Sequence, residues 1–107
     1  MKIPDKVRID GVDYEVIHKE NLNNGERLLL GEIDYVQSEI RLKHGQSNQY
    51  ACVTLLHEIL HGIAHHKKLD LGKNEENIID GFAFGIYQVL QDNARKLYDI
   101  CEDKEEV

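Results

Sequence analysis

The first part of the chain alternates between apolar and polar residues, as half-buried β-strands do. Residues 7–9 and 12–17 form two alternating runs on either side of Asp10-Gly11, a pair typical of a two-residue hairpin turn. Two further strands are predicted over residues 28–35 and 39–42. These strands should form a small, mostly antiparallel sheet with one face against helices. The residues expected on that face are Ile33, Tyr35, Ile40 and Leu42.

Helical spacing of apolar residues replaces this alternation after residue 46. A first helix is predicted to begin at a cap formed by Ser47 or Asn48. Its apolar positions recur three and four residues apart, and no proline interrupts them, which indicates a buried helix. They are Val53, Leu55, Leu56, Ile59, Leu60 and Ile63.

A second helix should follow a break at residues 68–72, with Asn74 as its cap. It can run to Tyr98, and Asp92-Asn93 is a weak point within it. Gly81 and Gly85 indicate either a close approach of the first helix or a tolerated irregularity. One apolar stripe is expected to pack on the first helix, namely Ile79, Phe82, Ala83, Ile86, Val89 and Leu90.

Together these elements predict an α+β fold in which the small sheet packs on two helices. A chain of 107 residues suffices for one core. We expect a single domain over residues 1–98. The acidic segment 99–107 is expected to be a flexible tail.

Composition narrows the classes of function. The net charge of −7 disfavours contact with nucleic acid, and no apolar run is long enough to cross a bilayer. The start lacks an apolar stretch of signal-peptide length, so a cytoplasmic location is expected. Cys52 and Cys101 are then reduced thiols, and their spacing does not suit a metal site.

The first helix carries the candidate chemistry in His57, Glu58 and His61. Residues four apart on a helix lie about 6 Å from each other on one face, so both imidazoles can reach one ion at about 2.0–2.1 Å. Glu58 points to the side, where it can take a proton from a metal-activated water. The alternative interpretation is that both histidines are hydrogen-bonded core residues that bind no metal.

A third ligand is not expected from the first helix. His65 lies two turns, about 12 Å, beyond His57. A histidine-only signature would need its third histidine where this chain has Lys67.

The second helix offers Glu76 and Asp80, which share one face. Glu76 is the expected ligand, and Asp80 is expected to accept the remaining ring N–H of His57 or His61. Glu75 stays open as the alternative ligand, although acids in a first helical turn are also favoured by the helix dipole alone.

The pair of motifs, His57-Glu58-x-x-His61 followed by Glu76-x-x-x-Asp80, resembles the gluzincin arrangement. The short chain is similar to compact zincin-like metallopeptidases of phages and mobile elements, near the ImmA/IrrE group. The likeness covers roughly residues 33–93. Ile59-Leu60 stand where leucine-glycine is usual, and the alanine-asparagine pair after the glutamate is missing. The resemblance implies a minimal zincin-like domain with one zinc ion held by His57, His61 and Glu76.

The resulting hypothesis is a zinc-dependent metallopeptidase in which Glu58 is the general base and the substrate is a peptide or protein. The strand around residues 32–35 could hold an extended substrate, and Tyr35, His65 or His66 could stabilise the oxyanion. Manganese, iron or nickel could replace zinc at such ligands. Two alternatives remain: a zinc-binding scaffold that acts as a protein-interaction module with little or no catalysis, and a metal-free helical interaction protein.

Overall fold

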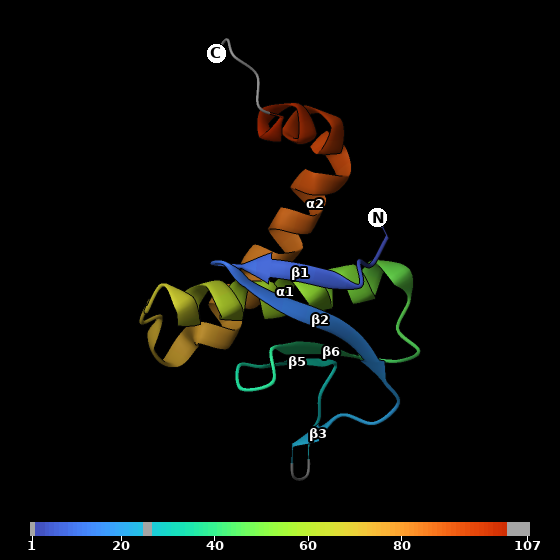
Figure 1. Cartoon of the computed structure of the whole chain (residues 1–107), viewed down its shortest axis with the longest axis vertical. Coiled ribbons are helices and arrows are strands. Elements are labelled where there is room, and N and C mark those ends of the chain that lie inside the picture. Colours follow the sequence, from blue (N-terminus) through green and yellow to red (C-terminus); the bar gives the residue numbers. More distant parts are fainter. Residues whose placement is uncertain (1, 25–26, 103–107) are drawn as a thin grey trace.

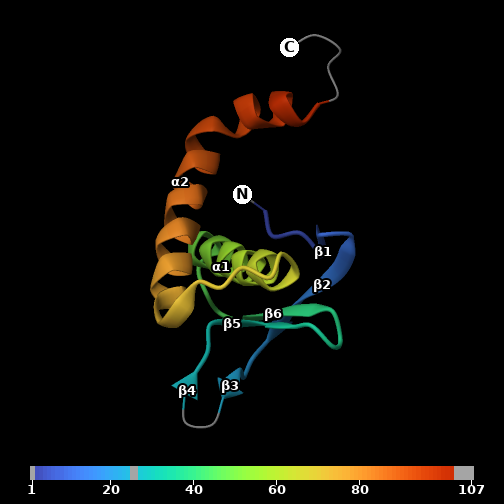
Figure 2. The same cartoon turned by 90° about the vertical axis from the view of Figure 1, so that its left-hand side faces the viewer.

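The computed structural model describes residues 2–24 and 27–102. A four-stranded sheet and two long helices form three layers, with α1 lying between the sheet and α2 (Figures 1 and 2). This α+β architecture confirms the predicted fold class. In chain order the elements are β1 (Lys6–Ile9), β2 (Val12–Lys19), β3 (Asn23–Asn24), β4 (Arg27–Leu28), β5 (Gly31–Asp34), β6 (Glu39–Lys43), α1 (Asn48–His66), a 3-10 turn (Gly72–Asn74) and α2 (Glu75–Cys101).

The predicted hairpin is the pair β1–β2, which is antiparallel with Ile9 opposite Val12. Asp10 and Gly11 both have positive φ, 51° and 83°. Positive φ at both central residues is the type I′ turn, whose twist matches the twist of the strands that it joins.

The sheet order is β1-β2-β6-β5, so β5 is an edge strand. Both outer pairs are antiparallel, as predicted, but the central pair β2–β6 is parallel. The predicted strand over residues 28–35 is interrupted, because β4 pairs with β3 in a separate small hairpin and β5 begins only at Gly31. Local alternation carries no information about which strand becomes the neighbour.

The core lies between the sheet and α1. Ile40 and Leu42 are fully buried, and Ile33 and Tyr35 pack against the same cluster, which confirms the predicted inner face. The other buried members of the cluster are Ile9, Tyr14, Val16 and Leu55.

Both helices begin where predicted. The Tyr50 amide donates to the Ser47 hydroxyl oxygen (3.1 Å), which caps α1. Asn74 is the N-cap residue of α2, but its side chain makes no capping hydrogen bond. Asn93 has non-helical angles (φ −134°, ψ 18°), so the predicted weak point is a kink. Beyond the kink α2 continues to Cys101, so the first residues of the predicted tail are helical, and residues 103–107 lie outside the described residues.

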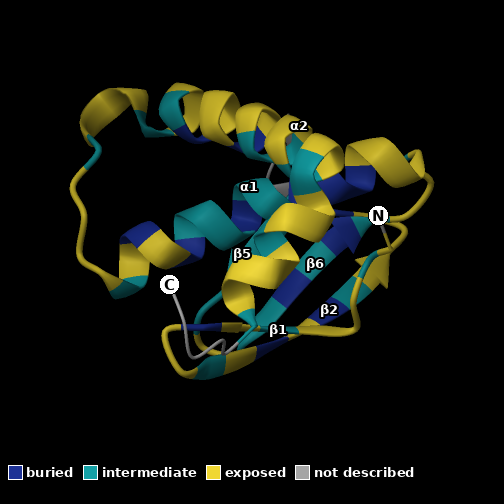
Figure 3. Cartoon of the chain, turned by 90° about the horizontal axis from the view of Figure 1, so that it is seen from above, coloured by how far each residue is buried: buried dark blue, intermediate teal, exposed yellow. Residues whose placement is uncertain are grey.

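The predicted packing stripe of α2 is too wide. Ile79 and Ala83 are buried, whereas Phe82 is 62% exposed. Phe82 lies about 60° around the helix from Ile79, and a single helix such as α1 covers only a narrow strip of its neighbour (Figure 3). A Cβ atom at Gly81 or Gly85 would meet nothing within 4 Å. These glycines are therefore not needed for a close approach of α1 to α2. Both glycines border an open apolar groove of about 610 Å³.

None of the helices in the described residues is long and apolar enough to cross a membrane.

Gly31 is where β5 makes its closest approach to α1. A Cβ atom there would lie 2.6 Å from Cγ2 of Thr54. The Thr54 hydroxyl donates to the Gln46 side-chain oxygen (2.8 Å) or to the Tyr50 carbonyl (3.0 Å), which restricts rotation of the threonine. A side chain at residue 31 would therefore force Thr54 to shift from this position.

We predict that Gly31→Ala lowers the free energy of unfolding by about 1–3 kcal/mol, because the added methyl group overpacks the contact with Thr54. Gly81→Ala is the matched control. It should raise the free energy of unfolding by up to about 1 kcal/mol, because alanine favours the helix and the site is open. Urea denaturation followed by circular dichroism measures both, and equal effects would contradict the close packing of β5 on α1.

Candidate metal centre

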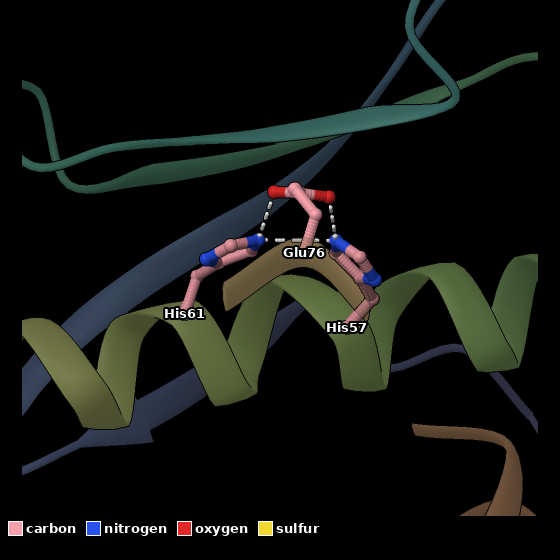
Figure 4. A group of neighbouring side chains, drawn as sticks. All are labelled: His57, His61 and Glu76. Carbon is pink, nitrogen blue, oxygen red and sulfur yellow. Dashed lines mark hydrogen bonds and ion pairs between the residues drawn. The ribbon is translucent and has the colours of Figure 1, made fainter. Parts of the chain in front are cut away.

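His57 and His61 lie one turn apart on α1, and their rings turn toward each other. The ring centroids are 4.7 Å apart, and the two Nε2 atoms are separated by 3.1 Å (Figure 4). Both side chains are largely buried. One nitrogen of each imidazole therefore points to a common location between the rings.

Glu76 faces the same location from the first turn of α2. Its Oε1 lies 2.7 Å from Nε2 of His61, and its Oε2 lies 3.2 Å from Nε2 of His57. Figure 4 shows this carboxylate bridging the two rings. Two imidazoles and one carboxylate thus offer ligand atoms that all lie within 4.8 Å of one another.

The outward nitrogens of the two rings also have acidic neighbours. Nδ1 of His57 lies 2.7 Å from Oδ1 of Asp80, and Nδ1 of His61 lies 2.9 Å from Oε2 of Glu75. A carboxylate accepts a hydrogen bond, and the tautomer with a proton on Nδ1 supplies the donor for each of these two contacts. In a neutral imidazole the Nε2 atom then keeps its lone pair, and that lone pair points to the common location.

These distances suit a cation of zinc size. Two lone pairs and a carboxylate at this separation repel one another unless a proton or a metal ion lies between them. Tetrahedral bonds of about 2.0–2.1 Å would place neighbouring ligand atoms about 3.3 Å apart. The observed separations, 3.1 Å between the two Nε2 atoms and 2.7 and 3.2 Å from them to the two oxygens of Glu76, are shorter than this by about 0.1–0.6 Å, so the ligand atoms would have to move apart to admit the ion.

The structure brings together His57, His61, Glu76 and Asp80, and it places Asp80 beside His57. Sequence analysis missed the position of Glu75, which pairs with the outward nitrogen of His61 and does not face the inner nitrogens. The first turns of α2 run back along α1, so the later histidine meets the earlier acid. If the chain is assumed to reverse its direction at the break at residues 68–72, the sequence predicts this pairing of His61 with Glu75 and of His57 with Asp80.

His65 and His66 lie outside this group. His65 stacks on Tyr35 with ring centroids 3.7 Å apart, and Nε2 of His66 lies 2.6 Å from the Tyr14 hydroxyl. Tyr35 in turn donates its hydroxyl to the carbonyl oxygen of His61 (3.2 Å), and burial raises the pKa of Tyr35 to about 12.

Glu58 lies beside the two histidines and is only 7% exposed. Burial raises the pKa of its carboxyl to about 7. The His61 ring opposes this rise, and the charges of Glu76, Glu32 and Asp80 add to it. The group is therefore able to exchange a proton near neutral pH.

A cleft of about 630 Å³ opens over this group. The edge strand β5, the outer side of α1 and the first turns of α2 form its walls. Its inner part contains the histidines and acids, and its other end is apolar. The residues at the apolar end are Leu29, Leu30, Tyr50, Val53 and Phe84.

Comparison of the chain with protein-family models, with curated proteins and with solved structures finds no match.

The raised pKa of Glu58 predicts a pH-dependent stability in metal-free protein. The carboxyl keeps its proton up to about pH 7 when folded, while the ordinary value near 4.5 applies when unfolded. The folded state then binds more protons between these values, so stability falls as pH rises through this window, and the loss is complete above it. Compared with Glu58→Gln, which cannot ionise, wild type should lose on the order of 3 kcal/mol between pH 4 and pH 8.

Urea denaturation of both proteins in the presence of a chelator measures this difference. A stability difference between wild type and Glu58→Gln that stays constant with pH would contradict the burial of an ionisable carboxyl at this position.

Proposed function

We propose that this chain is a zinc-dependent metallopeptidase with His57, His61 and Glu76 as zinc ligands. The observation that carries the proposal is the convergence of two Nε2 atoms and one carboxylate on a common location, while carboxylates hold both outward nitrogens. Asp80 and Glu75 orient the rings and increase their basicity. This donor set leaves a coordination position open, as in catalytic zinc sites.

A bound zinc ion polarises a carbonyl oxygen and lowers the pKa of a nearby water molecule to about 7. Glu58 would accept a proton from that water and pass it to the leaving amine as the C–N bond breaks. Its burial beside His57 and His61 supports this role, because a carboxylate shielded from water is a stronger base.

An extended peptide can reach this group along β5. Within the described residues this strand is paired with β6 on one side only, and its residues Gly31, Glu32 and Ile33 line the cleft. Addition of a peptide strand to the other edge of β5 would hold the substrate through main-chain hydrogen bonds. We place the activity in the cytoplasm, in keeping with two cysteines that are not joined in a disulfide.

A second candidate is a zinc-binding scaffold that recognises a protein partner without useful turnover. One observation favours it: the hydroxyl of Tyr35, a candidate to stabilise the oxyanion, donates to the carbonyl oxygen of His61. A peptidase would then need another donor for this purpose.

The metal site is tested on protein purified without a histidine tag. We expect about one zinc ion per chain by elemental analysis, loss of the ion in His61→Ala, and a 10- to 100-fold weaker affinity in Asp80→Asn, since Asp80 orients His57. His65→Ala is the matched control, because His65 lies on the same helix but stacks on Tyr35. It should keep wild-type affinity.

Wild-type protein that lacks stoichiometric metal and cannot be loaded with zinc would remove both candidate functions. An equal loss of zinc in His65→Ala and His61→Ala would contradict the assigned ligands. Elemental analysis also distinguishes zinc from manganese, iron and nickel.

Hydrolysis is tested with zinc-loaded Glu58→Gln. The variant should keep its zinc and lose activity on unfolded protein substrates by roughly 10²- to 10⁴-fold, because the general base is gone. Release of new amino termini measures the rate, and chelator-treated wild type is the control. Zinc-loaded wild type that cleaves no faster than Glu58→Gln would favour the scaffold.

A further inference from the structure

The apolar end of the cleft holds two aromatic side chains from different helices. Tyr50 lies in the first turn of α1, and Phe84 lies in the third turn of α2. Their rings meet edge to face, with centroids 6.5 Å apart and an interplanar angle of 85°. Their exposed fractions are 47% and 52%, so each ring keeps a large apolar surface open to the cleft.

This surface differs from the other exposed aromatic surface of α2. Phe82 is equally large and 62% exposed, but it lines the separate groove on the outer side of the helix. Phe84 shares a cleft with His57, Glu58 and Glu76. A ligand that reaches the histidines along β5 therefore passes the Tyr50–Phe84 pair, and it does not pass Phe82.

The spacing relates this pair to the bond that is cut. Tyr50 precedes His57 by seven residues, which is about 10 Å along the helix axis. An extended peptide advances about 3.3 Å per residue, so 10 Å corresponds to roughly three residues. Leu30, which immediately precedes β5, lines the same end of the cleft. A peptide paired with β5 would thus carry one side chain into this apolar end.

We propose that Tyr50 and Phe84 form a subsite for a bulky apolar side chain of a peptide, within three residues of the bond to be cut. The subsite deepens the proposed function and rests on it for the identity of that bond. It selects extended peptides that carry Phe, Leu or a similar side chain, and the apolar contact supplies the preference.

Binding to zinc-loaded Glu58→Gln tests the subsite without turnover. The probes are fluorescein-labelled peptides of glycine, serine and asparagine that carry a single Phe, Leu or Ala. Fluorescence anisotropy should show Phe and Leu peptides binding about tenfold more tightly than the Ala peptide. Adding Phe84→Ala should reduce the preference for Phe over Ala to below about threefold.

Phe82→Ala in the same background is the matched control, since it removes an equally exposed phenylalanine from the same helix. Thermal denaturation checks that both variants fold. No preference for Phe over Ala, or an equal loss of preference in both variants, overturns the subsite.

A different result would show that the proposed peptidase activity is wrong while the subsite is correct. Zinc-loaded wild type that does not cleave the peptides bound by Glu58→Gln overturns the peptidase. Binding that depends on Phe84 and not on Phe82 still supports the apolar subsite in that case.

Discussion

The contacts between two histidines of α1 and three acids of α2 are the interaction on which the rest of the site depends. Each imidazole meets one carboxylate at its outward nitrogen and shares Glu76 at its inward nitrogen. The apolar attachment of the long helix α2 is narrow, with only Ile79 and Ala83 buried. The polar contacts join the first turns of α2 to α1 beside this narrow attachment, and a cation that neutralises them would also stabilise the fold.

The same arrangement explains why Glu58 can remain protonated near neutral pH. Gly31 lets β5 approach α1 closely, and the approach covers Glu58 beside the histidines. Burial disfavours the charged form of a carboxylic acid, and nearby acids add to this effect.

Local signals in the sequence predicted the elements well. The Asp10-Gly11 turn, the Ser47 cap and the kink at Asn93 each depend on the preferences of one or two residues, and all three are present. Nonlocal features were predicted poorly. The parallel pairing of β2 with β6 and the break before β5 depend on which segments meet after a long connection. The apolar residues of α2 gave the right helix and included its buried residues Ile79 and Ala83, but the predicted contact surface was too wide, because α1 covers only part of it.

The order of amino acids alone placed His57 and His61 on one face of one helix, since helical periodicity is a local property of the backbone. It also narrowed the acidic partners to the first turns of the next helix. Only the tertiary structure decided that Glu76 faces the inward nitrogens, that Glu75 and Asp80 face the outward ones, and that Phe84 shares the cleft while Phe82 does not. These choices depend on the rotation and direction of α2 against α1, which the packing of side chains across the two helices determines.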